Sequence, residues 1–208
     1  MPDHRQQQTE AHIRAVCVFC GSRFGANTRF KKTAARLGQL LAENNIRLIY
    51  GGGHVGLMGT IADNVLENGG KVTGIIPEFL ESLEVGHDGL SEKIETDSMH
   101  SRKRRMFEMS DAFLTMPGGL GTLDETFEII TWKQLRLHNK PVIILDDNGY
   151  WQPFQKLITS TIENGFADES AARLYTTVNS ADEAISVLKS GTPQHPGQGP
   201  GTAKPERF

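Results

Sequence analysis

The chain has 208 residues, of which 38% are hydrophobic and 23% charged, a composition that is ordinary for one soluble globular domain. Its 22 basic and 25 acidic residues give a formal net charge of −3, which argues against a protein that coats nucleic acid, because such proteins usually carry a basic excess. No apolar run approaches the ~20 residues of a membrane span, and the first residues lack the apolar core of a signal peptide, so we expect a cytoplasmic protein with no membrane partner.

Strand and helix patterns alternate along the middle of the chain. Short runs rich in Val and Ile mark the strands, and apolar residues at helical spacing mark the helices. In chain order we predict a strand at 13–20, a helix at 28–44, a strand at 46–50, a helix at 56–67, a strand at 71–76, a helix at 98–110, a strand at 112–116, a helix at 120–137, a strand at 141–145, a helix at 151–164, a short strand at 175–178 and a helix at 181–188. Residues 77–97 are predicted as a long connection of mixed polarity, a feature that is often functional.

The predicted strands are continuous apolar runs, as expected when both faces of a sheet are covered. Their alternation with helices is typical of a Rossmann-like α/β fold, a doubly wound and mainly parallel sheet with helices on both faces. A closed barrel would need eight strands, and we predict five or six. In an open sheet of this kind, ligands bind beyond the carboxyl ends of the strands.

The two ends of the chain differ from this middle part. Residues 1–12 are polar, which predicts a disordered leader. Residues 191–208 are rich in Gly and Pro and nearly free of large apolar groups, which predicts a disordered tail. We therefore expect a single folded domain over residues 13–190.

The two cysteines, Cys17 and Cys20, have the spacing of a redox or metal pair. The residues around them favour a strand, however, in which side chains three positions apart point to opposite faces. No second cysteine pair completes a zinc site. We therefore expect two reduced thiols in a cytosolic protein.

Three glycine-rich turns follow predicted strands. They contain Gly21 with Ser22; Gly51, Gly52 and Gly53 with Gly56 and Gly59; and Gly118, Gly119 and Gly121. Glycine allows a sharp turn and a close ligand, and a helix start adds unpaired N–H donors with a partial positive charge. One such turn is as typical of a structural junction as of a phosphate site, but three at one end of a sheet favour a ligand. Neither the dinucleotide fingerprint nor the P-loop pattern is present, so we expect a mononucleotide or another small phosphate ester.

The segment PGGLGTLDE, residues 117–125, is predicted to hold the phosphate between a strand and a helix. Gly118 to Thr122 would surround it, with the Thr122 hydroxyl as an extra donor. Glu125 lies one turn into the helix and would face the same crevice at a distance from the phosphate. Alternatively, Asp124 and Glu125 are present only because carboxylates favour a helix N-terminus.

The segment DSMHSRKRRMFEM, residues 97–109, is the second informative site. On a helix, one face would carry Met99, Arg102, Met106 and Met109, with Lys103 beside it. A cation on an apolar face needs a partner or a ligand, because an unpaired buried charge is costly. Arg104 can pair with Glu108 on the solvated side. A basic stripe for nucleic acid fits poorly, because only four basic residues are consecutive and they divide between faces.

Other candidate residues carry weaker signals. His54, His87 and His100 lie in predicted loops or near helix starts, and no known metal-binding spacing links them, so we expect no metal site. Phe127 and Trp132 favour a place in the core or at a subunit interface. Glu84, in the long connection, lies near the crevice by topology, although a solvated loop charge is the simpler interpretation.

Four motifs together resemble a known family. CGS at 20–22, YGGGHVGLMG at 50–59, MHSRK at 99–103 and PGGLGTLDE at 117–125 are similar to the Lonely Guy family of cytokinin riboside 5′-monophosphate phosphoribohydrolases, often labelled lysine decarboxylase-like. The resemblance covers nearly all of residues 13–188. Two positions depart from the family pattern, His54 in place of an asparagine and Arg23 in place of a serine.

The resemblance implies a Rossmann-like homodimer that hydrolyses the N-glycosidic bond of an adenine-type nucleoside 5′-monophosphate. The products would be the free base and ribose 5-phosphate. The implied catalytic residues are Arg102 and Glu125. Together with the neighbouring turns, the candidate substrate-binding residues are Gly21, Ser22, Gly52, Gly53, Glu84, Met99, Lys103, Gly118, Gly119, Leu120, Gly121, Thr122, Leu123, Asp124 and Thr131.

A mechanism fits the two implied catalytic residues. Cleavage develops positive charge on the ribose, and the Glu125 carboxylate would stabilise that charge or orient the attacking water. Arg102 would position the substrate, because its pKa above ~12 prevents it from acting as a general acid near neutral pH. No metal or organic cofactor is required, and nothing in the sequence marks a pyridoxal phosphate lysine. The alternative is a non-catalytic nucleotide or cofactor carrier on the same fold, against which the presence of both Arg102 and Glu125 argues.

Overall fold

The computed structural model describes residues 13–84 and 86–190, and the side chains of residues 82–84 are outside the description. The predicted leader and tail therefore lie outside the described residues. Within these ranges the chain forms one seven-stranded sheet in which all strand pairs are parallel, in the order β4-β3-β2-β1-β5-β6-β7. The strands are β1 (Ala15–Phe19), β2 (Arg47–Tyr50), β3 (Val72–Pro77), β4 (Glu92–Thr96), β5 (Ala112–Thr115), β6 (Val142–Leu145) and β7 (Thr176–Val178).

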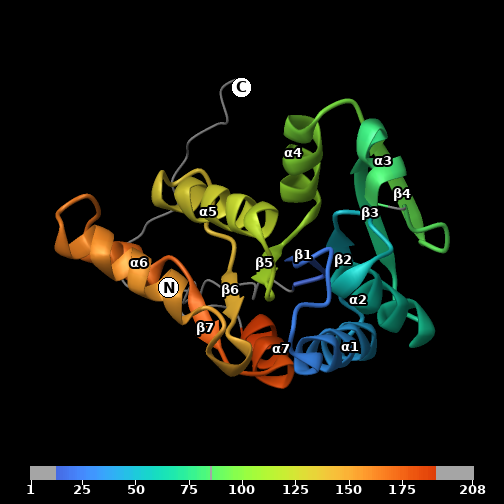
Figure 1. Ribbon diagram of the computed structural model, residues 1–208, viewed down its shortest axis with the longest axis horizontal. Coiled ribbons are helices and arrows are strands. Elements are labelled where there is room, and N and C mark those ends of the chain that lie inside the picture. Colours follow the sequence, from blue (N-terminus) through green and yellow to red (C-terminus); the bar gives the residue numbers. More distant parts are fainter. Residues whose placement is uncertain (1–12, 85, 191–208) are drawn as a thin grey trace, which may run out of the picture.

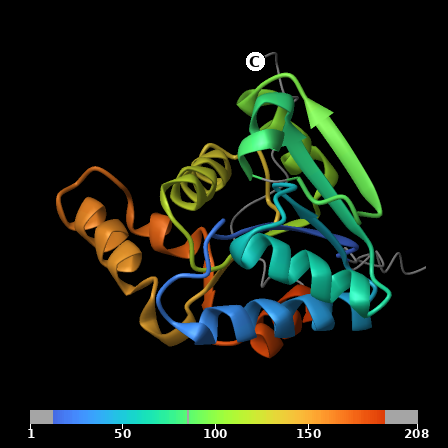
Figure 2. The same cartoon turned by 45° about the vertical axis from the view of Figure 1, so that its right-hand side comes forward.

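Helices cover both faces of the sheet, as Figure 1 shows. They are α1 (Thr28–Glu43), α2 (Gly56–Glu67), α3 (Glu78–Glu84), α4 (Met99–Met109), α5 (Leu120–Gln134), α6 (Gln152–Glu163) and α7 (Ala181–Ser190), with two short 3-10 turns at Asp147–Gly149 and Glu169–Arg173. α1, α2 and α7 pack on one face, where α1 and α2 run side by side (Figure 2). α4, α5 and α6 pack on the other. The predicted Rossmann-like fold is confirmed.

Two buried clusters of apolar side chains, one on each face, hold the layers together. Alternate residues of a central strand enter different clusters, as the pleat requires. Cys17 packs in the cluster beneath α4, α5 and α6, whereas Cys20 packs in the cluster beneath α1, α2 and α7. The two thiols are free and buried, and the prediction that they point to opposite faces is confirmed.

The prediction of a structureless connection over residues 77–97 was wrong. This segment contains α3 and the edge strand β4, which pairs with β3, so the sheet has seven strands rather than five or six. β4 reads EKIET, and of its residues only Ile94 packs against a buried cluster. An edge strand that carries charges lacks the apolar run that marks a buried strand. The backbone ladder to β3 and ion pairs such as Arg47 with Glu92, at 3.3 Å, stabilise it instead.

The chain changes the side on which it adds strands to the sheet between β1 and β5. From β1 the chain builds the sheet outward through β2, β3 and β4, and then returns to place β5 on the other side of β1. The turns that follow β1 and β5 therefore lie next to each other, and the Gly21 N–H donates to the Pro117 carbonyl at 3.0 Å. Such a reversal point is where open α/β sheets bind ligands. Among the described residues, no helix has the length and apolar character needed to cross a membrane.

Candidate active site

The N-terminus of α5 is open, in the sense that no side chain of the described residues covers its first turn. Gly119 is its N-cap and no side chain caps the helix there. A side chain added at Gly119 or Gly121 would meet no heavy atom within 4 Å, and Leu120 between them is 86% exposed. The first-turn amides of a helix have no partner within the helix, and the helix dipole makes them attractive to anions. The start of α5 is therefore suited to a phosphate.

Contacts within α5 and from two other segments shape this turn. The Thr126 hydroxyl donates to the Thr122 carbonyl at 2.6 Å and lies 2.9 Å from the Thr115 hydroxyl at the end of β5, which fixes α5 on the strand before it. The Tyr150 hydroxyl donates to the Gly118 carbonyl at 2.5 Å. A Cβ at Gly118 would stand 2.1 Å from the hydroxyl oxygen of buried Thr122, so this position requires glycine.

Arg102 lies on α4 and is only 5% exposed. Its Nε donates to the Ile75 carbonyl at 3.2 Å and its Nη2 donates to the Gly51 carbonyl at 3.3 Å. Its Nη1 lies 3.8 Å from the Met99 sulfur. These contacts with β3 and the turn after β2 hold the guanidinium at the carboxyl end of the sheet. They satisfy N–H donors with uncharged acceptors and keep a positive charge at this end of the sheet.

Gly51 makes room for this arginine. A Cβ at Gly51 would stand 2.1 Å from the Arg102 Nη2 atom, so a side chain there would displace the guanidinium. The next residue, Gly52, has a φ of +83° and its carbonyl accepts from the His87 N–H at 3.1 Å. Gly53 forms an isolated bridge with Gly86. The turn after β2 therefore serves chiefly to support Arg102 and the segment that follows α3.

Glu125 is half-buried on α5, one helical turn after the start of that helix. Burial raises the pKa of the Cys17 thiol well above its usual value, the charge of Glu125 raises it further, and the charge of Arg102 lowers it. Burial and the Glu125 charge likewise raise the pKa of Cys20. One charge on α4 and one on α5 therefore both act on the same buried thiol of β1.

Lys103 joins α4 to α5. Its ammonium lies 3.1 Å from carboxylate oxygens of Asp124 and Glu128. Burial lowers the pKa of Lys103, but the hydrogen bonds that its ammonium donates to these two carboxylates outweigh that effect and raise the pKa. Thr131 is exposed on the stripe of α5 that carries Asp124 and Glu128, at steps of four and three residues, and not on the side of Glu125.

The other predicted site residues are placed as follows. Met99 is half-buried beside Arg102, and Ser22 is exposed in the turn after β1. Leu123 packs against the cluster beneath α5, and its N–H donates to the Gly119 carbonyl at 3.0 Å. Glu84 is the last residue of α3, and its side chain is outside the description. The predicted pair of Arg104 with Glu108 is present at 2.9 Å, on the exposed side of α4.

The start of α2 is closed, although its glycines suggested a ligand. The Gly21 carbonyl accepts from the N–H groups of Leu57 and Met58, at 3.0 and 3.4 Å, so these first-turn amides already have an acceptor. A Cβ at Gly56 would stand 2.3 Å from the Ser22 carbonyl carbon. The turn after β1 therefore caps α2, and of the two helices only α5 offers an open N-terminus.

Sequence reasoning missed two features near these turns. Tyr150 comes from the connection between β6 and α6, and nothing in the local sequence indicated a contact with Gly118. His54, Asp63 and His87 come together behind the turn after β2, with ligand-type atoms all within 4.8 Å of one another. The only available signal was the presence of two loop histidines, which carry no metal-binding spacing.

The chain is similar in sequence and fold to known proteins. A family model described as possible lysine decarboxylase matches residues 58–188, more than half of the chain. A cytokinin riboside 5′-monophosphate phosphoribohydrolase of Arabidopsis thaliana is 39% identical over 189 residues, covering 91% of this chain and 89% of that protein. One from Rhodococcoides fascians is 40% identical over 178 residues, covering 85% and 90%. The chain belongs to the family of these phosphoribohydrolases.

Membership of this phosphoribohydrolase family confirms the resemblance seen in the four motifs. Solved structures add the fold. A molybdenum cofactor binding protein from Rippkaea orientalis matches with a TM-score of 0.64 and 24% identity, covering 86% of this chain and 98% of that chain. A Moco carrier protein from Chlamydomonas reinhardtii matches with a TM-score of 0.65 and 22% identity, covering 85% and 95%. At this level of identity, these likenesses establish a shared fold.

Proposed function

We propose that the protein hydrolyses the N-glycosidic bond of cytokinin-type nucleoside 5′-monophosphates, releasing the free base and ribose 5-phosphate. The observation that carries the proposal is the open N-terminus of α5 one helical turn before Glu125, with Arg102 at the same end of the sheet. The names of the phosphoribohydrolases that are 39% and 40% identical to this chain support the same activity.

The proposed chemistry places the 5′-phosphate on the first-turn amides of α5. When the bond between C1′ and the base nitrogen breaks, its electron pair leaves with the base and positive charge develops on the ribose. The Glu125 carboxylate stabilises that charge and orients a water molecule. The water oxygen bonds to C1′, its proton passes through Glu125 to solvent, and the departing base takes a proton from solvent.

Arg102 acts by position and charge. Its guanidinium is held by two carbonyls, so its donors are fixed before substrate binds. Arginine stays protonated near neutral pH, which excludes proton donation and leaves electrostatic attraction to the anionic substrate as its contribution. Lys103 adds a second positive charge and holds α4 against the exposed face of α5.

Exposed apolar side chains after three of the central strands support a base with an apolar substituent. Phe24 and Val55 come from the turns after β1 and β2, and Leu120 begins α5 after β5; they are 48%, 41% and 86% exposed. Apolar side chains at the mouth of a ligand crevice gain free energy when an apolar group covers them. We therefore expect an N6-prenylated adenine nucleotide to be preferred over AMP.

We also propose that the protein is a homodimer and lies in the cytoplasm. Leu135, Leu137 and Phe166 are large apolar side chains just after the ends of α5 and α6, and they are 64%, 39% and 88% exposed. Exposed apolar surface of this kind favours a subunit contact. Sedimentation equilibrium of the full chain would give twice the monomer mass for a dimer, and the monomer mass would contradict the proposal.

The test is an assay for released base with isopentenyladenosine 5′-monophosphate and with AMP. We expect free base from both, faster from the first. The variant Glu125→Gln keeps the shape of the side chain and removes its charge, so turnover should fall at least about 100-fold while nucleotide binding persists. The matched control is Glu128→Gln on the same helix, which should keep most of its turnover. Binding without release of base by the unaltered protein would favour the carrier alternative.

A further inference from the structure

We propose that His54, Asp63 and His87 form a binding site for one divalent transition-metal ion of the Zn²⁺ type, separate from the nucleotide crevice. Two imidazoles and one carboxylate are donors that suit Zn²⁺ and Co²⁺ better than Mg²⁺ or Ca²⁺, which prefer sites made of oxygen atoms alone. The candidate ligand atoms of the three residues all lie within 4.8 Å of one another. No motif spacing links them in the sequence.

Three separate elements bring the ligands together. His54 directly follows the Gly51–Gly53 turn, Asp63 lies on α2, and His87 follows α3. The His87 N–H donates to the Gly52 carbonyl at 3.1 Å, and Gly86 bridges with Gly53. The two loop segments are therefore fixed to each other by backbone contacts before any ion binds.

The distances need only a small adjustment. In a tetrahedral Zn²⁺ site with bonds of about 2.0–2.1 Å, two ligand atoms stand about 3.4 Å apart. The widest pair, within 4.8 Å here, therefore has to approach by at most about 1.4 Å. His87 Nε2 and Asp63 Oδ1 are already 2.9 Å apart. The rings of His54 and His87 have centroids 4.6 Å apart in an edge arrangement. Exposed His54 has the freedom to make the remaining movement, whereas His87 is 6% exposed and stays in place.

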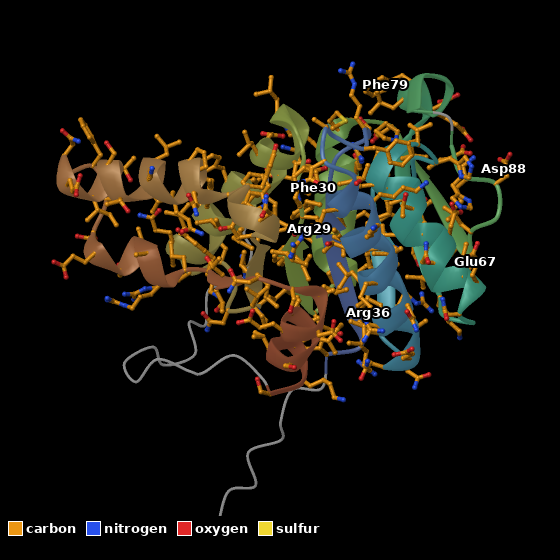
Figure 3. The ribbon with its side chains drawn as sticks, turned by 60° about the horizontal axis from the view of Figure 1, so that its bottom comes forward. Arg29, Phe30, Arg36, Glu67, Phe79 and Asp88 are labelled. Carbon is orange, nitrogen blue, oxygen red and sulfur yellow. The ribbon has the colours of Figure 1, made fainter. Side chains whose placement is uncertain are left out.

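Binding of the ion changes which ring nitrogen of His87 carries the proton. The Gly89 N–H donates to His87 Nδ1 at 3.0 Å, so the neutral ring carries its proton on Nε2 and donates it to Asp63. A metal ion takes the place of that proton on Nε2, and the neutral ring then carries a proton on Nδ1 instead. The Gly89 N–H then has to donate its hydrogen bond to water instead of to His87 Nδ1. Asp88 lies at the outer edge of the molecule (Figure 3), and both Asp88 and the next residue, Gly89, are exposed, which permits this change.

The alternative is a structural histidine with satisfied hydrogen bonds. That alternative explains the contacts of His87 with Asp63 and Gly89, and it limits His54 to an edge contact between its ring and that of His87. With His54 the site has three ligands, and water can fill the remaining positions because His54 and Asp63 are accessible. The site adjoins the Gly51–Gly53 turn, whose first carbonyl accepts from Arg102, yet it includes none of the residues assigned to the nucleotide.

Calorimetric titration of the full chain with Zn²⁺, repeated with Co²⁺ and its visible absorption, tests the site. We expect one ion per chain in the unaltered protein and a Co²⁺ spectrum typical of nitrogen and oxygen ligands. His54→Asn and Asp63→Asn should each lose at least about tenfold in affinity. His100→Asn, which changes an exposed histidine on α4, is the matched control and should bind as the unaltered protein does.

Two results would overturn the proposal. One is the absence of Zn²⁺ binding to the unaltered protein. The other is unchanged affinity in His54→Asn, which would place the ion at the thiols or at other histidines. Circular dichroism of each variant checks folding. If Asp63→Asn fails to fold, His54→Asn still decides the question, because its side chain is exposed and its loss leaves the His87 contacts intact.

Discussion

The starts of α2 and α5 look alike in sequence but differ in the structure. Each follows a central strand through a glycine-rich turn at the carboxyl end of the sheet. At α2 the Gly21 carbonyl accepts from the first amides, and Gly56 is pressed against the turn after β1. At α5 the positions of Gly119 and Gly121 open onto free space. Glycine serves close backbone packing at the first helix and access for a ligand at the second.

The difference shows why a glycine count is a poor guide to a phosphate site. A helix N-terminus binds an anion only when its amides have no other acceptor. At α2 the acceptor comes from a turn more than thirty residues earlier in the chain, so the local sequence of α2 contains no sign of it. Substitutions at the two turns should therefore act on different properties, stability at α2 and substrate binding at α5.

The largest expected effect is that of Gly56→Ala. The residue has a φ of +69°, and the new Cβ would stand 2.3 Å and 2.4 Å from backbone atoms of Ser22 and Arg23. Backbone cannot move aside as a side chain can, so we expect the free energy of unfolding to fall by about 3 kcal/mol or more. Denaturant unfolding followed by circular dichroism measures it. Unchanged stability would show that the start of α2 is as open as that of α5.

Gly51→Ala should act on turnover more than on stability. Its Cβ would displace the Arg102 guanidinium, which is the end of a flexible side chain and yields more easily than backbone, with loss of its hydrogen bonds to two carbonyls. Without the fixed arginine, we expect turnover of the monophosphate to fall about 100-fold. Steady-state kinetics with a parallel thermal unfolding curve separates the two effects. A large loss of stability with normal turnover in the folded fraction would show that the position of Arg102 does not matter for turnover.

Gly121→Ala is the counterpart of Gly56→Ala at the open turn. The added methyl meets no protein atom, and alanine favours helix by up to about 1 kcal/mol, so stability should stay the same or rise. The methyl would stand where the phosphate binds, and we expect KM for the monophosphate to rise about tenfold. Kinetics and denaturant unfolding on the same sample test both statements. A normal KM would place the phosphate elsewhere.

Tyr150→Phe should have a smaller effect. The variant removes the hydrogen bond to the Gly118 carbonyl and keeps the ring, which packs against Phe30 and Trp151. A hydrogen bond of this kind contributes about 1 kcal/mol, so KM should rise no more than about fivefold. Because the turn and not the reacting atoms is affected, kcat should stay nearly constant. A fall in kcat at constant KM would give Tyr150 a different role.

The smallest effect concerns Lys103 and high pH. Its pKa in the folded protein is raised above the ordinary value of 10.5, so its ion pairs stabilise the folded state below that pH. This stabilisation is lost as pH rises through the folded pKa. The free energy of unfolding should therefore fall more steeply above pH 10.5 in the unaltered protein than in Lys103→Met. Equal slopes would show that the link between α4 and α5 contributes no stability.

Most of the fold followed from the sequence because most of the strands are buried. Continuous apolar runs such as VIIL of β6 have one interpretation in an α/β protein. The edge strand β4 was not predicted, because backbone pairing with β3 and ion pairs stabilise it, and neither produces an apolar pattern in the sequence. Missing β4 also hid the position of His87, which lies between α3 and β4.

The sequence predicted which residues form the candidate site, but not which groups they contact. Helical spacing predicted that Arg102 would lie on an apolar face and need partners. Those partners are the carbonyls of Ile75 and Gly51, from strands and turns remote in sequence, which no local pattern reveals. Likewise, the contact of Tyr150 with Gly118 and the meeting of His54 with His87 depend on how whole elements pack.

The dependence of base release on the 5′-phosphate tests the central claim most directly. The unaltered protein is given isopentenyladenosine 5′-monophosphate and, separately, isopentenyladenosine, and free base is measured by chromatography. If the open start of α5 holds the phosphate, kcat/KM for the monophosphate should exceed that for the nucleoside at least about 100-fold, since binding energy from the phosphate positions the reacting bond. Equal rates for the two compounds, or no base from either, would contradict the account.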